Sequence, residues 1–355
     1  RRPSCTGYPA RGSLTHMAGD GRGSSTVGAA FNILCTVVGT GLLNLPAGFS
    51  QSGWIGAPLL VIMCCMAGYT ARVLIKCLDY VQPKGADGLL SNGLVDGGRK
   101  ETELTYGDIG HAALGTFGRW FVAVQMHLTL IMVAAIYMLL AALNIMTLFP
   151  HVPWLTQPVT VLIISSVAVA HVFLKTLSEV TALSYVNITI NLVLTVVVIT
   201  AALMNPPATP PSTTFAVQAP LSLGKAFASF GFAFGVHPIL PSIYHSMAHP
   251  ANYGKMVVLA FGFVMLFYLP MATVGYGVYG DAVLSPVYET PQIKESGAAT
   301  NVAIALITAH LVLAYPLVLN PPETALENAL HIDRWGPRAE LPLRILLRCG
   351  FIGLT

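Results

Sequence analysis

Long apolar runs separated by short polar segments dominate the pattern of this chain. Most runs extend about 20 residues or more, enough for a helix rising about 1.5 Å per residue to cross a hydrocarbon layer of roughly 30 Å. None shows the strict alternation of apolar and polar positions that is typical of a membrane β-barrel. We therefore predict eight complete helical spans and the start of a ninth, at about residues 27–50, 54–78, 117–148, 157–174, 179–204, 223–247, 255–280, 299–320 and 341–355.

The composition indicates the same class of protein. Of the 355 residues, 54% are hydrophobic and only 9% are charged, whereas a soluble domain carries about 25% charged residues. The chain is thus predicted to be an all-α polytopic membrane protein. The net charge of +3 gives no indication of a nucleic-acid partner. No cofactor and no metal site are expected.

The distribution of Lys and Arg predicts the orientation in the membrane. If the N-terminus is cytoplasmic, only Lys225 and Lys294 of the 18 basic residues fall in outer segments, and the other 16 face the inside. Cytoplasmic loops carry the excess of Lys and Arg in membrane proteins. We therefore expect the 79–116 segment to be cytoplasmic and the 205–222 and 281–298 segments to be external.

The first and the sixth predicted spans contain helix-breaking sequences, at residues 39–46 and 230–241. Glycine is a poor helix former, and proline removes a backbone donor and clashes with the preceding turn. Irregular backbone survives at membrane depth only where it is buried in protein or lines a cavity. Two such spans, five apart, predict a five-plus-five inverted repeat with the binding site at the breaks. A pair of ordinary kinked helices is the alternative, because Gly and Pro are common in membrane spans.

The two breaks predict the kind of ligand. The N-terminus of a half-helix offers unpaired N–H groups to a carboxylate, whereas exposed carbonyls attract an ammonium group or a cation. A zwitterionic α-amino acid carries both groups. The candidate substrate-binding residues are Gly39, Thr40, Gly41, Phe232, Ala233, Phe234 and Gly235, with Phe232 or Phe234 shaping the pocket for the side chain of the substrate.

At these residues the sequence resembles the amino acid/auxin permease family. The resemblance covers about residues 25–355 and implies a LeuT-like fold of eleven spans, of which about nine lie in this chain. It also implies secondary active transport of amino acids by alternating access. The matching segments are Phe31-Asn32, residues 39–46, Gly53-Trp54-Ile55-Gly56, Gly68-Tyr69-Thr70, the loop Thr105-Tyr106-Gly107-Asp108-Ile109, residues 232–241, and Asn320-Pro321-Pro322 with Glu327.

The resemblance leaves the coupling ion open between a proton and sodium. The first break is most similar to proton-coupled members, and the sixth span is more similar to sodium-coupled neutral amino acid transporters. Those sodium-coupled members carry an Asn where this chain has Cys35, and a Thr in the eighth span where it has Val312 or Ala314. Because a hard cation prefers oxygen ligands, these differences favour the proton. Thr308 remains as one oxygen ligand for sodium.

Histidine is the expected proton carrier, because the predicted spans contain almost no Asp or Glu at depth. It titrates near neutral pH, and an ionisable group inside the membrane is a functional candidate by default. We take His237, inside the break of the sixth span, as the first candidate. His310, midway along the eighth span, is the second. The alternative for each is a neutral imidazole that only satisfies buried polar groups.

Residues 1–26 are polar and rich in Gly and Arg, and they are predicted to form a disordered cytoplasmic tail. Residues 27–355 are predicted to form the transporter domain, which the end of the chain truncates within the ninth span. A non-transporting amino acid sensor of the same fold is the rival function. An enzyme is not expected, because no catalytic cluster lies within the spans. The sequence does not decide between plasma membrane and vacuolar or lysosomal membrane, and it indicates no protein partner.

Overall fold

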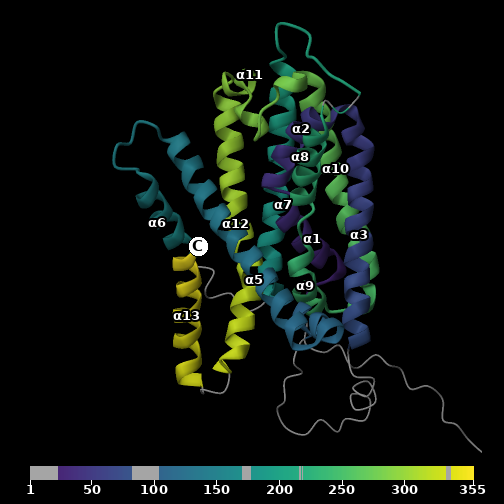
Figure 1. Ribbon diagram of the computed structural model, residues 1–355. Helices are drawn as coiled ribbons and strands as arrows, with labels where there is room; N and C mark the ends of the chain where they lie inside the picture. Colours follow the sequence, from purple (N-terminus) through teal and green to yellow (C-terminus); the bar gives the residue numbers. More distant parts are fainter. Residues whose placement is uncertain (1–22, 82–103, 170–176, 216, 218, 333–336) are drawn as a thin grey trace, which may run out of the picture.

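The computed structural model describes residues 23–81, 104–169, 177–215, 217, 219–332 and 337–355, and within them the chain is a bundle of helices (Figure 1). The α-helices are α1 (Thr26–Val37), α2 (Thr40–Ser52), α3 (Gly56–Val81), α5 (Tyr106–Leu148), α6 (Gln157–Ala168), α7 (Leu177–Met204), α8 (Pro220–Ala233), α9 (Leu240–Ser246), α10 (Tyr253–Tyr279), α11 (Pro291–Lys294), α12 (Ala298–Ala329) and α13 (Pro337–Leu354). Short 3₁₀ helices are η1 (Gly53–Ile55), η3 (His237–Ile239), η4 (Pro250–Asn252), η5 (Gly280–Ala282) and η6 (Val287–Glu289).

Helices long and apolar enough to cross a membrane confirm the predicted class. The described residues contain six such helical stretches, from α2–α3 to α12. α1 and α6 are apolar but shorter. α1 is short because the first predicted span is broken at its centre. The predicted fourth span, residues 157–174, begins with α6, and its last part falls in residues 170–176, which lie outside the described residues. The five-plus-five repeat and the total number of spans stay predictions.

One predicted loop is helical. The segment before the third span begins α5 at Tyr106, and its N-terminus is a capping box in which the Asp108 side chain accepts a hydrogen bond from the backbone N–H of Thr105 at 2.8 Å. A capping box satisfies two of the amides that a helix start leaves free. The helix bends where Leu114 and Gly115 leave helical geometry, with Gly115 at φ +63°. This segment therefore begins a helix at Tyr106 and bends it at Leu114 and Gly115.

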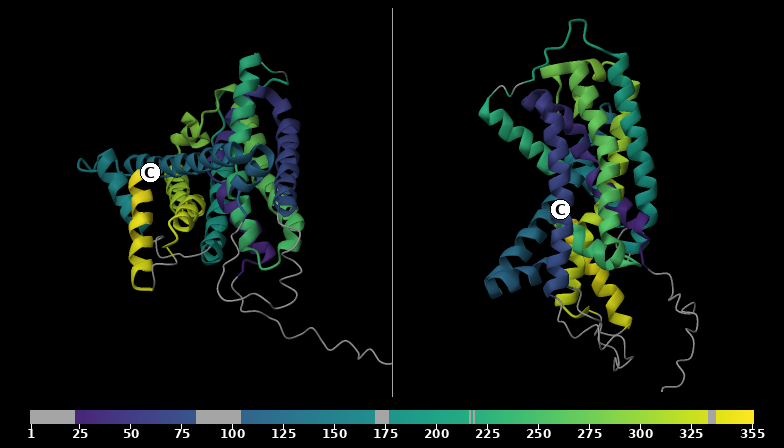
Figure 2. Two further views of the ribbon diagram at one scale, coloured as in Figure 1. Left: turned by 60° about the horizontal axis from the view of Figure 1, so that its bottom comes forward. Right: turned by 90° about the vertical axis from the view of Figure 1, so that its right-hand side faces the viewer.

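The broken spans lie together inside the bundle. Figure 1 shows α2 and α8 in the upper half and α1 and α9 in the lower half, with α3 and α10 on one side of them and α5 and α12 on the other. α2 packs against α8 and α10, and α1 packs against α7 and α10. In the right-hand view of Figure 2, α8 begins at the edge of the bundle and runs inward. The two breaks are therefore held at mid-height between helices from both sides.

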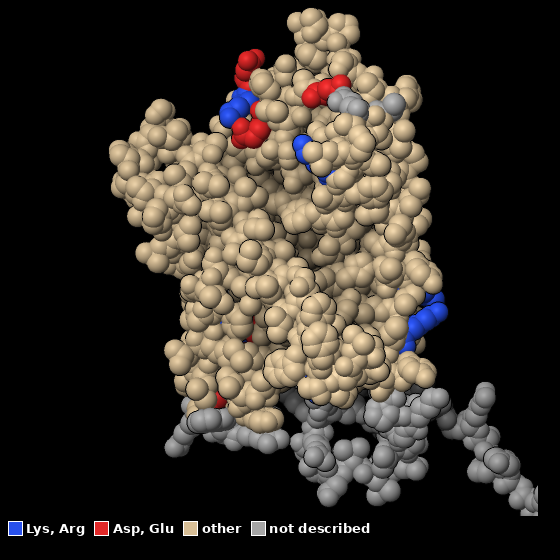
Figure 3. Space-filling view, in the orientation of Figure 1, with Lys and Arg blue, Asp and Glu red and all other residues tan. Residues whose placement is uncertain are grey.

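The surface is that of a protein surrounded by lipid. Figure 3 shows Lys, Arg, Asp and Glu in the upper and lower parts of one face, with a broad band between them in which none of these charged residues is visible. Large apolar side chains are exposed along α5, including Leu128, Met132 and Ile136. Leaving such a side chain in water costs about 1.5–3 kcal/mol. A hydrocarbon environment removes that cost.

The chain before α1 is tied to the chain after α9. The N–H of Ser24 donates to the carbonyl of Ser246 at 2.7 Å, and the N–H of Ala248 donates to the carbonyl of Ser24 at 2.9 Å. Of the predicted tail, residues 1–22 lie outside the described residues, whereas Ser24 is buried by this pairing. The start of α1 and the end of α9 are thus held together by hydrogen bonds.

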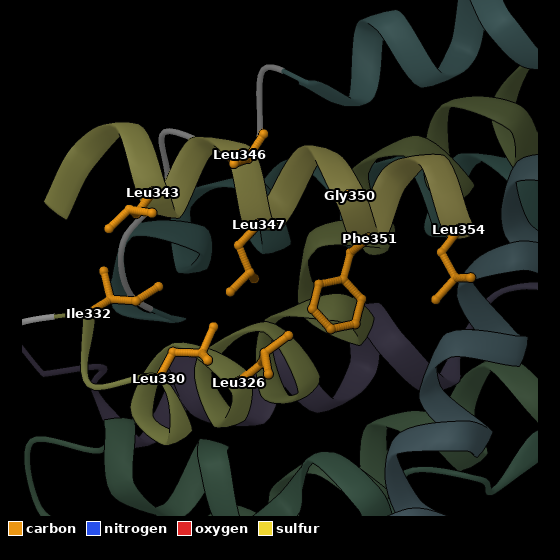
Figure 4. A pocket seen from close by; sticks show the side chains of 9 residues that line it. All are labelled: Leu326, Leu330, Ile332, Leu343, Leu346, Leu347, Gly350, Phe351 and Leu354. Atoms are coloured by element: carbon orange, nitrogen blue, oxygen red, sulfur yellow. The ribbon is translucent and has the colours of Figure 1, made fainter. Parts of the chain in front are cut away.

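α12 and α13 enclose the largest group of buried charges among the described residues. Arg348 of α13 donates to Glu327 of α12 at 2.7 Å and lies 3.7 Å from Glu323, while Arg344 pairs with Glu327 and Glu340. The predicted end of the eighth span at residue 320 left these carboxylates outside, but α12 continues to Ala329 and buries two of them. Beside this group the two helices leave an apolar pocket of about 450 Å³ (Figure 4), lined by Leu326, Leu330, Ile332, Leu343, Leu346, Leu347, Gly350, Phe351 and Leu354.

Candidate functional site

The first and sixth spans are broken within the predicted segments 39–46 and 230–241, although the helices continue through Pro46 and Pro241. α1 ends at Val37 and α2 begins at Thr40, with Gly39 between them at φ −168° and ψ −121°. α8 ends at Ala233, and η3 restarts the helix at His237, where Pro238 stands in its first turn. Each break exposes the carbonyls that end one half-helix and the amides that begin the next. Both breaks predicted from the sequence are therefore confirmed.

The C-terminal ends of the two first half-helices meet at one side chain. The hydroxyl of Tyr268, from α10, lies 2.6 Å from the carbonyl oxygen of Val37 and 2.6 Å from that of Ala233. A hydroxyl has one proton, so it satisfies one of these carbonyls at a time. The ends of α1 and α8 both carry partial negative charge. Two negative helix ends thus converge on a position now held by a single O–H donor.

The start of α2 lies directly beside this point. A β-carbon on Gly41 would come within 2.8 Å of the Ala233 α-carbon and 3.5 Å of the Tyr268 hydroxyl. Gly41, a candidate substrate-binding residue, therefore permits the close approach of α2 to α8. The free amides of the first turn of α2 and the carbonyl ends of α1 and α8 are therefore neighbours.

His310 reaches the first break from α12. Its Nε2 occupies the space that a β-carbon on Gly39 would need, and this nitrogen is buried without a hydrogen-bond partner. Its Nδ1 lies 2.9 Å from Asn187 Oδ1 and 3.1 Å from Asn191 Nδ2, both on α7. The side chain of His310 is 0% exposed. An unpaired ring nitrogen is thus directed at the broken backbone.

Tyr137 of α5 closes this side of the site. Its hydroxyl donates to the carbonyl of Thr36 at 3.4 Å, and its ring centroid lies 6.5 Å from that of His310. Tyr137 and Tyr268 therefore both donate to carbonyls in the last turn of α1, from opposite helices. Cys35, one residue before Thr36, accepts a hydrogen bond from Asn187 Nδ2 at 2.7 Å through its sulfur.

The structure separates the two candidate histidines. His237 is half-buried in η3, and its Nε2 lies 2.8 Å from the hydroxyl of Thr70 on α3. His310 instead contacts Gly39 of the first break. The order of preference from the sequence put His237 first, because it stands within a break. Of the two histidines, His310 is the one whose ring is placed against the first break.

The aromatic candidates of the sixth span also differ from one another. Phe234 is buried, and its ring lies 5.4 Å from that of Tyr268 and 6.3 Å from that of Phe261. Phe232 is 46% exposed, and Gly235 is also exposed. Of the two phenylalanines, only Phe234 is brought to the convergence at Tyr268.

Sequence reasoning missed Asn187, Asn191 and Tyr268. The two asparagines stand four residues apart in an otherwise apolar span, and a polar pair on one helix face in the membrane was the available signal. No signal in the sequence indicated Tyr268, since a tyrosine in an apolar helix usually only packs against its neighbours. Thr308, the remaining oxygen ligand considered for sodium, donates to the carbonyl of Ile304 in its own helix at 2.7 Å. Among the described residues, no group of three or more His, Cys, Asp or Glu is placed to hold a metal.

With this geometry in view, the chain matches the family of transmembrane amino acid transporter proteins over residues 22–355. The chain belongs to this family. It is a family of transporters and not of enzymes, which confirms both the resemblance drawn from the sequence and the expected absence of an enzymatic role.

Individual relatives are plant proteins of the same family. The chain is similar to Amino acid transporter AVT1C of Arabidopsis thaliana, with 25% identity over 89% of this chain and 55% of the relative. It is 25% identical to Amino acid transporter AVT1B over 89% of the chain and 56% of that protein. It is 27% identical to Amino acid transporter AVT1I, also from Arabidopsis thaliana, over 91% of the chain and 75% of that protein. The chain thus spans about half the length of the first two relatives.

Proposed function

We propose that this chain forms part of a secondary active transporter that moves amino acids across a membrane by alternating access. The observation that carries the proposal is the convergence of the carbonyl ends of α1 and α8 on the Tyr268 hydroxyl, next to the start of α2. The relatives are named as amino acid transporters. Two discontinuous helices at the middle of the membrane are typical of a LeuT-like inverted repeat, which we adopt as the fold.

The substrate binds as a zwitterion in this proposal. Its carboxylate accepts hydrogen bonds from the free amides at Thr40 and Gly41, where the N-terminus of α2 carries partial positive charge. Its ammonium group takes the place of the Tyr268 hydroxyl between the carbonyls of Val37 and Ala233. An ammonium has three N–H donors and satisfies both carbonyls at once, whereas the hydroxyl satisfies one. Phe234, beside Tyr268, borders the side chain of the substrate.

A proton is the proposed coupling ion, and His310 is its proposed carrier. The unpartnered Nε2 at Gly39 supports this choice, because a proton bound there sits beside the backbone that binds the substrate. Cys35, which replaces the Asn of sodium-coupled members, is already the acceptor for Asn187, and Thr308 is bonded within α12. His237 stays as the second candidate, with sodium coupling and an amino acid sensor as the alternatives.

The experiment is uptake of a panel of labelled amino acids by full-length protein in proteoliposomes, with pH and sodium gradients imposed separately. We expect accumulation that follows the proton gradient and is unchanged when choline replaces sodium. Collapse of uptake in choline at constant pH would establish sodium coupling instead. Binding of an amino acid without uptake or exchange under any gradient would favour the sensor. Protein-free liposomes and a protonophore are the controls.

The setting in the cell is part of the same proposal. We place the protein in the plasma membrane or in a vacuolar or lysosomal membrane, with a cytoplasmic N-terminus. Imaging of a C-terminally tagged full-length protein together with markers of these membranes distinguishes them.

A further inference from the structure

Two asparagines of α7 face the same nitrogen of His310. Asn187 Oδ1 lies 2.9 Å from His310 Nδ1, and Asn191 Nδ2 lies 3.1 Å from the same atom. Asn187 and His310 are 0% exposed and Asn191 is 1% exposed. Their spacing of four residues puts both amides on one face of the helix. The nitrogen thus has a hydrogen-bond acceptor and a hydrogen-bond donor within reach.

Cys35 determines which end of the Asn187 amide faces the imidazole. Asn187 Nδ2 donates to Cys35 Sγ at 2.7 Å, so Oδ1 is left to face His310. Asn191 presents its NH₂ group to the same nitrogen, and its Oδ1 is buried without a partner. Asn187 therefore offers a hydrogen-bond acceptor to His310 Nδ1, and Asn191 offers a donor.

This arrangement provides for every protonation state of the ring. When Nδ1 carries a proton, as in the cation and in one neutral tautomer, it donates to Asn187 Oδ1. When Nδ1 is unprotonated, as in the other neutral tautomer, it accepts from Asn191 Nδ2. A buried ring nitrogen without a partner is costly, so a single fixed amide would favour one state over the others. The pair of amides removes that bias.

We propose that Asn187 and Asn191 are positioning residues that allow His310 to take up and release the coupling proton at Nε2. The inference deepens the proposed function and rests on it for the identity of the coupled process. One proton from water binds the lone pair of Nε2 when the break is open to one side of the membrane, and the same proton returns to water on the other side. The N–H bond forms as one O–H bond of a hydronium ion breaks, and on release the proton forms an O–H bond with a water molecule.

The other titratable groups around His310 do not offer a competing partner. Tyr137 faces its ring from α5, Cys35 of α1 is bonded to Asn187, and His237 of η3 is bonded to Thr70. Within α12 the nearest carboxylate is Glu323, 13 residues further along and so about 20 Å away by helical rise. Glu323 lies with Arg348 of α13, whose other partner is Glu327. The described ion pairs do not include His310.

The first test is independent of transport. Full-length protein with ¹⁵N-labelled histidine is reconstituted in lipid, and solid-state NMR distinguishes Nδ1–H from Nε2–H rings. Loss of signals in His310→Gln identifies those of His310 among the 10 histidines of the chain. Wild-type protein is expected to show both neutral tautomers. Asn187→Leu removes the acceptor and should leave only Nε2–H, whereas Asn191→Leu removes the donor and should leave only Nδ1–H.

The second test measures the pH at which proton-driven uptake is half-maximal. Loss of the acceptor makes the cation less stable, so Asn187→Leu should move this midpoint to lower pH. Loss of the Asn191 donor makes a neutral form less stable, so Asn191→Leu should move it to higher pH. A shift of about one pH unit for Asn187→Leu corresponds to a tenfold change in proton affinity, the size of one hydrogen bond. The shift for Asn191→Leu should be smaller, roughly 0.3 pH unit, because the Nδ1–H tautomer remains and the loss of one of two equally populated neutral forms only halves the neutral population. Thr195→Val, one turn further along the same face, is the matched control and should cause no shift.

Opposite shifts are the result that a merely structural role would not produce. Leu has nearly the shape of Asn, and substrate exchange at equal pH on both sides shows whether each variant still folds. Cys35→Ala provides a second route, because it frees the Asn187 amide to turn and should move the midpoint in the same direction as Asn187→Leu. Shifts of the same sign, or an unchanged tautomer ratio in the asparagine variants, would overturn the inference. A third outcome is that NMR shows the predicted tautomers but wild-type protein exchanges no amino acid. This would refute the proposed function, whereas the roles of the two amides toward His310 would stand.

Discussion

The imidazole of His310 lies so close to Gly39 that its Nε2 fills the space of a β-carbon at that position. The φ of Gly39, −168°, lies outside the left-handed region that favours glycine. The glycine is required because a side chain from a helix 271 positions later in the sequence, in α12, occupies the space beside it. The break in the first span and the ionisable group in the eighth are thus in direct contact.

Gly39→Ala should abolish amino acid exchange, because the new methyl group displaces His310 from the break. The double variant Gly39→Ala/His310→Ala should recover exchange, although not proton-driven accumulation, since the space is restored and the proton carrier is lost. Residues in contact give such non-additive effects. Counterflow in proteoliposomes measures both. Gly262→Ala is the control, because no heavy atom lies within 4 Å of its β-carbon position. Normal exchange by Gly39→Ala alone would contradict the contact.

Tyr268→Phe should lower the thermal stability of the substrate-free protein, since two buried carbonyls lose their shared donor at a cost of about 1–3 kcal/mol. Saturating substrate should stabilise this variant more than the wild type, because the ammonium group supplies the missing donors. Melting temperatures in detergent, with and without the transported amino acid, measure the difference.

Tyr279→Phe is the matched control for that prediction. Tyr279 lies on the same helix, is 2% exposed, and its hydroxyl also faces two carbonyls, those of Ala202 at 3.3 Å and Asn205 at 3.0 Å. It should lose similar stability, while the shift caused by substrate stays at the wild-type value. Equal substrate effects in Tyr268→Phe and wild type would place the ammonium elsewhere.

Arg348→Met should destabilise the protein by about 3–5 kcal/mol, because it leaves the buried carboxylate of Glu327 without its closest partner. Arg119→Met removes an ion pair to Asp108 in which the Arg side chain is 49% exposed, so its effect should stay below about 1 kcal/mol. Chemical denaturation of both variants in the same detergent gives the comparison. A loss for Arg348→Met no larger than that for Arg119→Met would show that the charges between α12 and α13 are hydrated.

The orientation prediction is tested by an impermeant thiol reagent on intact cells. In a cysteine-free background, Ala208→Cys should be labelled from outside, since it is exposed in the predicted external 205–222 segment. Ala251→Cys, exposed between α9 and α10, should react only after permeabilisation. The reverse pattern would invert the topology. Residues 82–103 of the predicted cytoplasmic 79–116 segment lie outside the described residues, so Ala251 is the better probe of that side.

The local predictions succeeded where a short stretch of chain decides the outcome. Apolar runs of sufficient length gave membrane helices, and Gly39 and Pro238 marked the two breaks. The family resemblance implied a loop at Thr105, whereas the capping box of Thr105 and Asp108 begins α5 there. The predicted end of the eighth span at residue 320 was wrong, because α12 continues to Ala329. Buried Glu323 and Glu327 look like a solvated helix end until Arg348 is placed beside them.

The sequence by itself determined the class of the protein, its family, the position of its broken helices and the list of histidines inside the membrane. The class and the breaks follow from hydrophobic length and from the backbone chemistry of glycine and proline, both of which act within a few residues. The family follows from the resemblance of residues 25–355 to its motifs. Only the tertiary structure decided that His310 rather than His237 contacts the first break, and that Asn187 and Asn191 face His310 while Tyr268 bridges the ends of α1 and α8. Such meetings depend on the rotation and height of one helix against another. That geometry is set by the packing of the whole bundle, and no local pattern in the chain encodes it.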